Sequence, residues 1–262
     1  MSLRRVLADC QFLRRLLFPL FRRMNVEVRW RHDVTRRGFS LMTWLHKGYW
    51  YYGNTRELNE LSRFEEFIDT GDCVLEVGGH IGYVTQVFEK LVGDTGRVFV
   101  AEPSPVSRNL LQKNVLPETT ILPVALSDKV GEADFYLEEF GGFMNSIDKD
   151  FTENSHRELR KYQHKTDSQV TRISVPVSTV DEVCNQYDIT PKFIKIDTEG
   201  HEINVLQGAF NILPYVTALM VEVTKHHSEV YNLMYGLGFR AKDEGGREIT
   251  GEFLGGNIFF YK

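Results

Sequence analysis

The sequence is poor in cysteine and has no long uninterrupted apolar segment. Its 262 residues include three cysteines, Cys10, Cys73 and Cys184, which are far apart and form no CxxC or Cys/His pattern. A disulfide framework and a zinc site are therefore unsupported, and a reducing, cytoplasmic environment fits best. The mean hydropathy of −0.28 excludes a polytopic membrane protein. We expect a globular protein without internal repeats.

Lysine is absent from residues 1–37, which instead hold ten arginines and three acidic residues, whereas the whole chain has a net charge of −5. The rest of the chain is therefore acidic, which argues against nucleic-acid binding. Residues 3–24 place arginines on one side of a predicted helix and apolar residues on the other. Docking on the same domain or on a second subunit of a homodimer, peripheral contact with an anionic membrane, and a transit peptide all fit this pattern.

The patterning divides the chain into a basic amphipathic segment (1–37), an aromatic and helical lead-in (38–70) and a main domain (71–262). Within the main domain, short apolar runs alternate with helical patterns, which predicts an α/β fold with a parallel sheet covered on both faces by helices. Strands are predicted at 73–77, 98–101, 121–125, 173–177, 193–196, 218–223, 239–242 and 257–261, and helices at 55–68, 83–91, 107–114, 180–187, 202–210 and 228–236. Residues 138–172 are highly charged and interrupt this alternation as a lid-like insertion.

The first strand of the main domain ends in a glycine-rich loop, Glu76-Val-Gly-Gly-His-Ile-Gly82. Glycines at a strand-to-helix turn let a ligand approach the backbone next to the helix N-terminus. The dinucleotide fingerprint G-x-G-x-x-G would need a glycine where Val77 stands, so an NAD-type oxidoreductase is disfavoured. The spacing Glu76-x-Gly78-x-x-x-Gly82 instead suits an amino-acid-like ligand such as S-adenosylmethionine, whose amino group would donate a hydrogen bond to the acid. A purely structural glycine turn is the third interpretation.

Two further acidic positions are consistent with S-adenosylmethionine binding. Glu102 follows the strand 98–101, where a carboxylate would accept hydrogen bonds from both ribose hydroxyls. Lys195 lies inside the apolar strand 193–196, and an unpaired buried charge is costly, so we expect it to pair with Asp197 or Glu199. Since ligands of open α/β sheets bind at the carboxyl ends of the strands, Asp197 and the glycine loop should share one crevice. This pair is either structural or part of the reaction site.

Together these motifs resemble the FkbM-type S-adenosylmethionine-dependent methyltransferases, in order from about residue 60 to the C-terminus. The segments that carry the resemblance are 76–82, Glu102-Pro103, 125–128, Asn145-Ser146 and, most distinctively, 195–209. The resemblance implies a Rossmann-like class I methyltransferase fold, with a seven-stranded, mostly parallel sheet whose last strand is antiparallel. It also implies methyl transfer, mostly to hydroxyl oxygens of sugars, glycolipids or polyketides, so that a small molecule or glycan would be the acceptor.

The resemblance assigns cofactor contacts residue by residue. These are Glu76, Gly78, Gly79 and Gly82 around the methionine part, Glu102 at the ribose, Ser127 and Asp128 beside the adenine, and Asn145, Ser146 and Asp197 near the reacting end. His80, Tyr83 and Pro103, next to these motifs, are counted with the cofactor contacts. Two positions depart from the family pattern: Glu76 replaces the more usual aspartate, and His80 replaces the more usual asparagine. His80 would either meet substrate or cap the following helix.

Methyl transfer to an alcohol needs a base, because a hydroxyl is a weak nucleophile near neutral pH. Asp197 is the first candidate, followed by Glu199 and His201, although His201 also fits a solvated first helical turn. Glu222 lies at the same predicted edge, but two carboxylates are thin support for Mg²⁺, and no metal is predicted. A non-catalytic protein that retains the methyltransferase fold is the remaining alternative.

Overall fold

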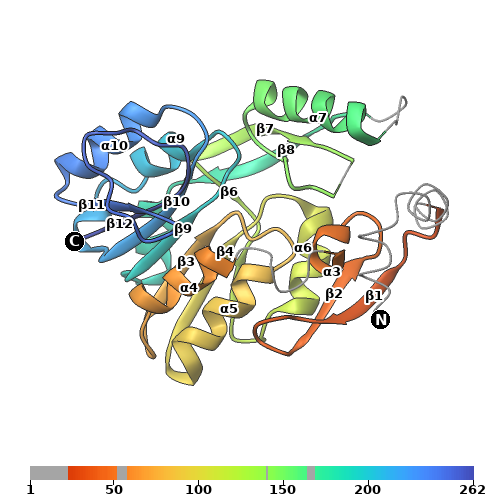
Figure 1. Cartoon of the computed structure of the whole chain (residues 1–262), viewed down its shortest axis with the longest axis horizontal. Helices are drawn as coiled ribbons and strands as arrows, with labels where there is room; N and C mark the ends of the chain where they lie inside the picture. The colour runs from red at the N-terminus through yellow and green to blue at the C-terminus, as the bar shows by residue number, and fades with distance from the viewer. Residues whose placement is uncertain (1–22, 52–57, 140, 164–168) are drawn as a thin grey trace. The chain divides into compact units, whose positions relative to one another are not determined.

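Figure 1 shows the computed structural model of the chain, which describes residues 23–51, 58–139, 141–163 and 169–262. The backbone contacts group the chain into two compact units, Met1–Leu58 and Asn59–Lys262. The helix predicted at 3–24 lies almost entirely outside the described residues. Within the described part of the chain, every helix is too short or too polar to cross a membrane.

The first unit contains a β-hairpin and a short helix. Strands β1 (Glu27–Arg31) and β2 (Gly38–Met42) pair antiparallel, and α3 (Lys47–Tyr51) follows. Phe39, Leu41 and Tyr49 are buried, with the rings of Phe39 and Tyr49 5.5 Å apart. The sequence analysis predicted no strand here, because arginines at alternate positions of β1 obscure its apolar pattern.

The second unit is built on a seven-stranded sheet in the order β11-β12-β10-β9-β3-β4-β5. Its strands are β3 (Cys73–Val77), β4 (Arg97–Ala101), β5 (Thr120–Leu122), β9 (Phe193–Ile196), β10 (Ala218–Val223), β11 (Arg240–Asp243) and β12 (Gly256–Tyr261). The last strand, β12, is antiparallel to both β10 and β11, whereas β3, β4, β5, β9 and β10 pair parallel. The predicted α/β sheet with an antiparallel last strand is confirmed.

Helices cover both faces of this sheet. They are α4 (Leu58–Phe67), α5 (Tyr83–Val92), α6 (Pro105–Asn114), α8 (Val180–Tyr187), α9 (Glu202–Gln207) and α10 (His227–Gly236), with single 3₁₀ turns at Gly93–Thr95 and Leu213–Tyr215. On one face, Phe64 of α4 packs against Phe88 of α5 and against Phe193 and Phe259 of the sheet. On the other face, the core joins apolar residues of α8, α9 and α10 to alternate residues of the strands.

The strand predicted at 121–125 is wrong as a single element. The main sheet keeps β5 only to Leu122, and β6 (Ala125–Leu126) belongs to a separate three-stranded sheet with β8 (Thr171–Ser178) and β7 (Gly131–Leu137). Pro123 separates the two strands, since proline has no N–H to continue the ladder. The insertion begins after β7 and includes the helix α7 (Lys149–Gln163), which Figure 1 shows running above β7 and β8.

Candidate active site at the carboxyl ends of the strands

The glycine loop between β3 and α5 lies directly against the loop that follows β9. A Cβ atom on Gly78 would stand 1.9 Å from the carbonyl oxygen of Asp197, and one on Gly79 would stand 2.1 Å from Val100 Cγ2. Gly78 also has a φ of +90°, which other residues rarely adopt. The structure therefore brings Asp197 and the glycine loop together, as predicted, and explains why glycine is needed at both positions.

Glu76 lies beneath this loop and is almost completely buried, with 1% of its surface exposed. Its Oε2 accepts a hydrogen bond of 2.6 Å from the hydroxyl of Thr85 on α5. Burial raises the pKa of Glu76 to about 7, although Lys195 and Thr85 oppose this shift. A cationic amino group at Glu76 would therefore favour its ionised form. Thr85 was not predicted; the signal for it is a small hydroxyl residue in the first turn of the helix that follows the glycine loop.

Glu102 has its carboxylate fixed by backbone donors. Oε2 accepts from the N–H of His80 and Oε1 from the N–H of Ser104, both at 2.8 Å. Arg108 donates to the carbonyl oxygens of Glu102 and Pro103, at 2.9 and 2.5 Å. Burial raises the pKa of Glu102 to about 7 against these hydrogen bonds. Each carboxylate oxygen can accept a second hydrogen bond, so the two oxygens of Glu102 suit two neighbouring hydroxyl groups of a ligand.

His80 does not cap α5, because the N-cap residue of that helix is Gly82. The prediction that His80 caps this helix is therefore wrong. The backbone of His80 is left-handed, with a φ of +46°, and its ring contacts Gly141 instead, with Nε2 2.7 Å from the carbonyl oxygen. The ring also lies 4.6 Å from that of Phe143. Contact of His80 with a substrate stays a prediction.

The buried lysine pairs with Asp197 rather than Glu199. Lys195 is 2% exposed, and its Nζ lies 2.7 Å from Asp197 Oδ2. Lys195 is also aligned with Glu76 on the neighbouring strand β3, so one ammonium group serves two carboxylates. Burial disfavours the charge of Lys195, but Asp197 and Glu76 outweigh burial and raise its pKa. The sheet thus links the acid under the glycine loop to the acid at the end of β9.

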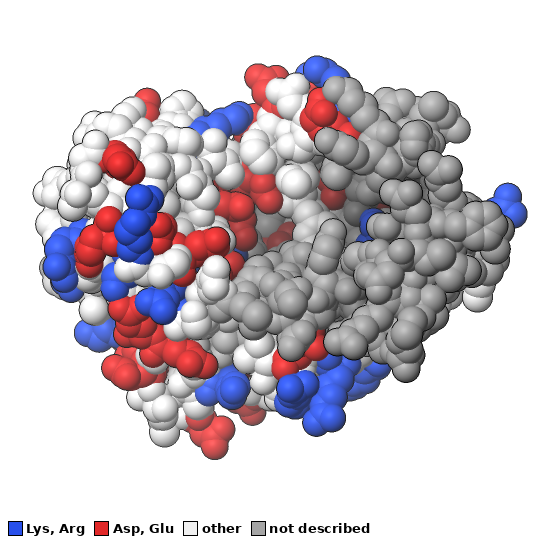
Figure 2. All heavy atoms as spheres, in the orientation of Figure 1, with Lys and Arg blue, Asp and Glu red and all other residues white. Residues whose placement is uncertain are grey.

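Three carboxyl groups meet at this end of the sheet. Carboxylate oxygens of Asp197, Glu199 and Glu222 lie within 4.8 Å of one another. Figure 2 shows acidic side chains gathered near the middle of the view, where Figure 1 draws the ends of the parallel strands. Glu199 is held in a left-handed turn, with a φ of +55°, followed by Gly200 at +96°. The turn brings Glu199 back toward Asp197 immediately after the strand ends.

The three carboxyl groups differ in protonation. Burial opposes ionisation of Asp197, but the Lys195 ammonium outweighs it and lowers the pKa of Asp197. The charge of Asp197, together with burial, raises the pKa of Glu222 to about 11. Burial and the same charge raise the pKa of Glu199 well above its usual range. Asp197 is therefore the ionised member at neutral pH and the one able to accept a proton.

Oxygen ligands at this spacing resemble those that a divalent cation uses. Acidic groups often cluster without an ion, and no other feature of the described residues points to one. We therefore assign no metal, and the absence of a metal stays a prediction.

The side chain of His201 forms a hydrogen bond with Ser127, which the resemblance places beside the adenine. Its Nε2 lies 2.8 Å from Ser127 Oγ, which in turn donates to Asp128 Oδ1 at 2.8 Å. The Ser127 hydroxyl has one proton, so His201 Nε2 is the donor in this chain of hydrogen bonds. Burial lowers the pKa of His201. These contacts direct His201 to Ser127 and leave its predicted role as a base without support from the geometry.

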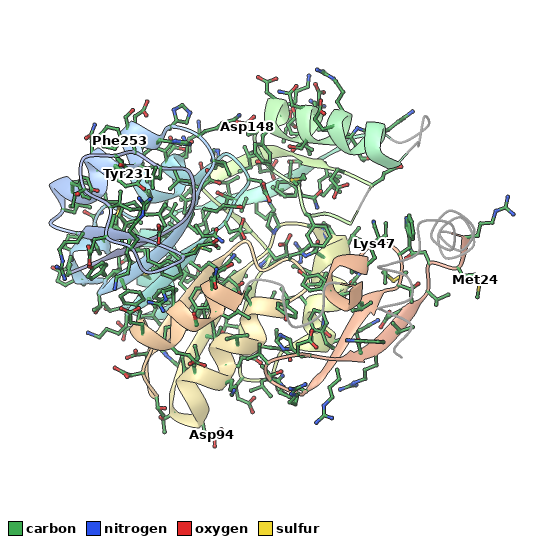
Figure 3. All side chains as sticks on the ribbon, in the orientation of Figure 1. Met24, Lys47, Asp94, Asp148, Tyr231 and Phe253 are labelled. Carbon is green, nitrogen blue, oxygen red and sulfur yellow. The ribbon has the colours of Figure 1, made fainter. Side chains whose placement is uncertain are left out.

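The insertion is fastened to the loops that follow β9 and β10. Ser146 Oγ donates to the carbonyl oxygen of Thr198 at 3.1 Å, and Asn145 Oδ1 accepts from the N–H of Glu138 at 2.8 Å. Lys225 Nζ lies 2.6 Å from a carboxylate oxygen of Asp148, which Figure 3 labels at the start of α7. Ser146 therefore ties the insertion to the loop after β9, whereas Asn145 closes a turn within the insertion. Lys225 was not predicted, because its partner is 77 positions away in sequence.

Comparison with protein families decides between the two cofactors that the glycine loop suggested. A family model described as the methyltransferase FkbM domain matches residues 76–241, more than half of the chain. The chain belongs to the FkbM methyltransferase family. Its cofactor is S-adenosylmethionine, not NAD. The matched region begins at Glu76 and includes the glycine loop, Glu102, the insertion and the acidic residues that follow β9.

Individual relatives are distant. The hexuronic acid methyltransferase AglP of Haloferax volcanii is 26% identical over 162 residues, which cover 60% of this chain and 58% of AglP. An FkbM methyltransferase structure from Methylobacillus flagellatus has a TM-score of 0.47 and 14% identity, covering 94% of this chain and 59% of that chain. An S-adenosylmethionine-dependent O-methyltransferase from Thermotoga maritima has a TM-score of 0.43 and 13% identity, covering 91% and 77%. The chain thus spans less than two thirds of the length of the first two.

Proposed function

We propose that this FkbM-family protein transfers a methyl group from S-adenosylmethionine to a hydroxyl oxygen of a sugar or of a sugar-containing molecule. The observation that carries the proposal is the ion pair between buried Lys195 and partly buried Asp197, whose carboxylate stands on the residue that abuts the glycine loop through its backbone. In the proposed complex, Glu76 accepts from the amino group of the cofactor and Glu102 accepts from the ribose hydroxyls. Bound in this way, the cofactor would present its methyl group to an acceptor held beside the acids at the end of β9.

The reaction is an in-line displacement at the methyl carbon. The cofactor would supply the methyl group: the acceptor oxygen would bond to its carbon as the carbon–sulfur bond breaks, with S-adenosylhomocysteine as the second product. Asp197 takes the hydroxyl proton as the new bond forms, and Lys195 keeps Asp197 ionised and oriented for this step. Proton transfer to a positioned base contributes about 10²- to 10⁴-fold, and alignment of the reacting atoms contributes further.

The choice of a sugar hydroxyl is supported by the distant relative AglP, whose name records methylation of a hexuronic acid. Oxygen as the accepting atom is supported by Asp197, because a base is needed for a hydroxyl and not for an already nucleophilic thioether or thiolate. Membrane contact through residues 3–24 and a homodimer stay predictions, since they depend on residues outside the described part of the chain.

The proposal is tested by incubating the protein with S-adenosylmethionine and a panel of matched glycosides, in which each hexuronide has a neutral hexoside counterpart. Mass spectrometry would follow S-adenosylhomocysteine and the methylated glycoside together. Formation of a methyl ether confirms hydroxyl methylation, whereas a methyl ester on the hexuronides alone would move the reaction to the carboxylate. Calorimetric binding of S-adenosylhomocysteine without turnover of any glycoside would favour the non-catalytic alternative.

A further inference from the structure

His80 contacts both sides of the site, through two different groups. Its backbone N–H donates to Glu102 Oε2 at 2.8 Å, on the cofactor side. Its ring Nε2 lies 2.7 Å from the carbonyl oxygen of Gly141, in the insertion. A carbonyl oxygen can only accept a hydrogen bond, so Nε2 carries the proton and donates it. The neutral Nε2–H tautomer and the imidazolium both make this bond.

The segment that His80 reaches, residues 141–146, is fastened at its other end to the loop carrying the acids. Ser146 Oγ donates to the carbonyl oxygen of Thr198, between Asp197 and Glu199. Next to Gly141, a Cβ atom on Gly142 would lie 3.5 Å from His80 Nε2 and 3.0 Å from Asn145 Nδ2. The segment therefore runs from the cofactor loop to the β9 loop and passes close to His80.

We propose that His80 is a positioning residue for methyl transfer: its imidazole sets residues 141–146 against the cofactor loop and thereby sets the acceptor relative to the sulfonium methyl. The inference rests on the proposed function for its chemical meaning. Because methyl transfer needs the oxygen and the methyl carbon in line at near-contact distance, a small displacement of this segment costs rate without loss of the cofactor.

The backbone and ring of His80 can be tested separately. Asparagine tolerates a left-handed backbone well, so His80→Asn should keep the loop and the N–H that serves Glu102. Its side-chain nitrogen, however, ends where histidine has Nδ1 and does not reach Gly141. Glutamine places an amide nitrogen near the position of Nε2, so His80→Gln should restore the donor. His226→Asn is the matched control, since His226 is also left-handed, with a φ of +53°, and its side chain is exposed.

The experiment combines hydrogen exchange of residues 141–146 with calorimetric binding of S-adenosylhomocysteine. For His80→Asn we expect cofactor affinity within about twofold of wild type, and amide exchange in 141–146 faster by up to about tenfold, the range that loss of one hydrogen bond allows. His80→Gln should return exchange toward the wild-type rate, and His226→Asn should leave it unchanged. With a glycoside that turns over, kcat/KM for the acceptor should fall in His80→Asn and recover in His80→Gln.

Unchanged exchange in His80→Asn would overturn the inference, and so would faster exchange that His80→Gln does not reverse. An equal loss of cofactor affinity in His80→Asn and His80→Gln would also overturn it, because His80 would then act on cofactor binding alone. If the wild-type protein bound no S-adenosylhomocysteine, the proposed function would fail, but the exchange rates of the ligand-free protein would still show whether the imidazole holds this segment.

Discussion

The cofactor side and the acceptor side of the site are held together by different kinds of contact. On the cofactor side, backbone N–H groups fix Glu102, and a Cβ atom on Gly78 or Gly79 would collide with Asp197 after β9 or with Val100 of β4. On the acceptor side, side-chain contacts such as Lys225–Asp148 and Ser146–Thr198 join loops that are far apart in sequence. The first kind of contact leaves a local sequence motif, whereas the second leaves none.

The strongest test of this comparison is Asp197→Asn, at the point where the two sides meet. Removing the base should lower the rate of methyl transfer by about 10²- to 10⁴-fold, because the hydroxyl proton loses its acceptor. Binding of S-adenosylhomocysteine should persist, since it is the Asp197 backbone, not its carboxylate, that abuts Gly78. The measurement is S-adenosylhomocysteine formation with a glycoside that turns over, with the exposed Asp150→Asn as control. Loss of cofactor binding in Asp197→Asn would place this acid on the cofactor side.

The contrast also explains which parts of the molecule were predictable from sequence. Strands β3 and β9 are apolar runs with one charged residue each, Glu76 and Lys195, and are followed by glycines or acids, so their ends and the acids beyond them could be located. Strand β7 was missed because Glu132 and Asp134 on its solvent side hide the alternation of its inner residues. The family motif located Asn145 and Ser146, but their hydrogen bonds to backbone groups of the insertion and the β9 loop are a tertiary result that no spacing reveals.

The second prediction concerns the ammonium group shared between the two sides. Lys195→Met leaves buried Glu76 and partly buried Asp197 without their counter-charge, and breaking a buried pair costs about 3–5 kcal/mol of unfolding free energy, an upper limit here because Asp197 is 31% exposed. Without the lysine, both acids are favoured in their protonated form when folded, so the loss should be larger at pH 8 than at pH 6. Urea unfolding at both pH values measures this, with the exposed Lys192→Met as control. An equal and small loss in both variants would contradict a shared role for Lys195.

The third prediction concerns the cofactor side alone and is a dependence of cofactor affinity on pH. Burial raises the pKa of Glu76 and of Glu102 to about 7, from the usual 4.5. If the cofactor needs both acids ionised, lowering the pH from 8 to 6 should weaken its affinity about tenfold for each group. Without cofactor the folded protein holds these protons more tightly than the unfolded chain, so its unfolding free energy should fall as the pH rises from 4.5 to about 7.

Calorimetry across this pH range measures the third effect, and Glu102→Gln should remove one of the two titrations. An affinity independent of pH in the wild-type protein would mean that neither acid contacts the cofactor in its ionised form.

The smallest effect is expected where the acceptor side is held by a partly exposed ion pair. Lys225→Met removes the contact with Asp148, and such pairs contribute about 0.2–1 kcal/mol to stability, so the loss of unfolding free energy should be less than 1 kcal/mol. Because α7 loses one of its ties to the β10 loop, KM for the acceptor should rise while cofactor affinity stays at the wild-type value. Arg172→Met, which breaks the exposed pair with Asp134 between β7 and β8, is the matched control and should change neither constant. A change in cofactor affinity in Lys225→Met would show that the two sides are not held independently.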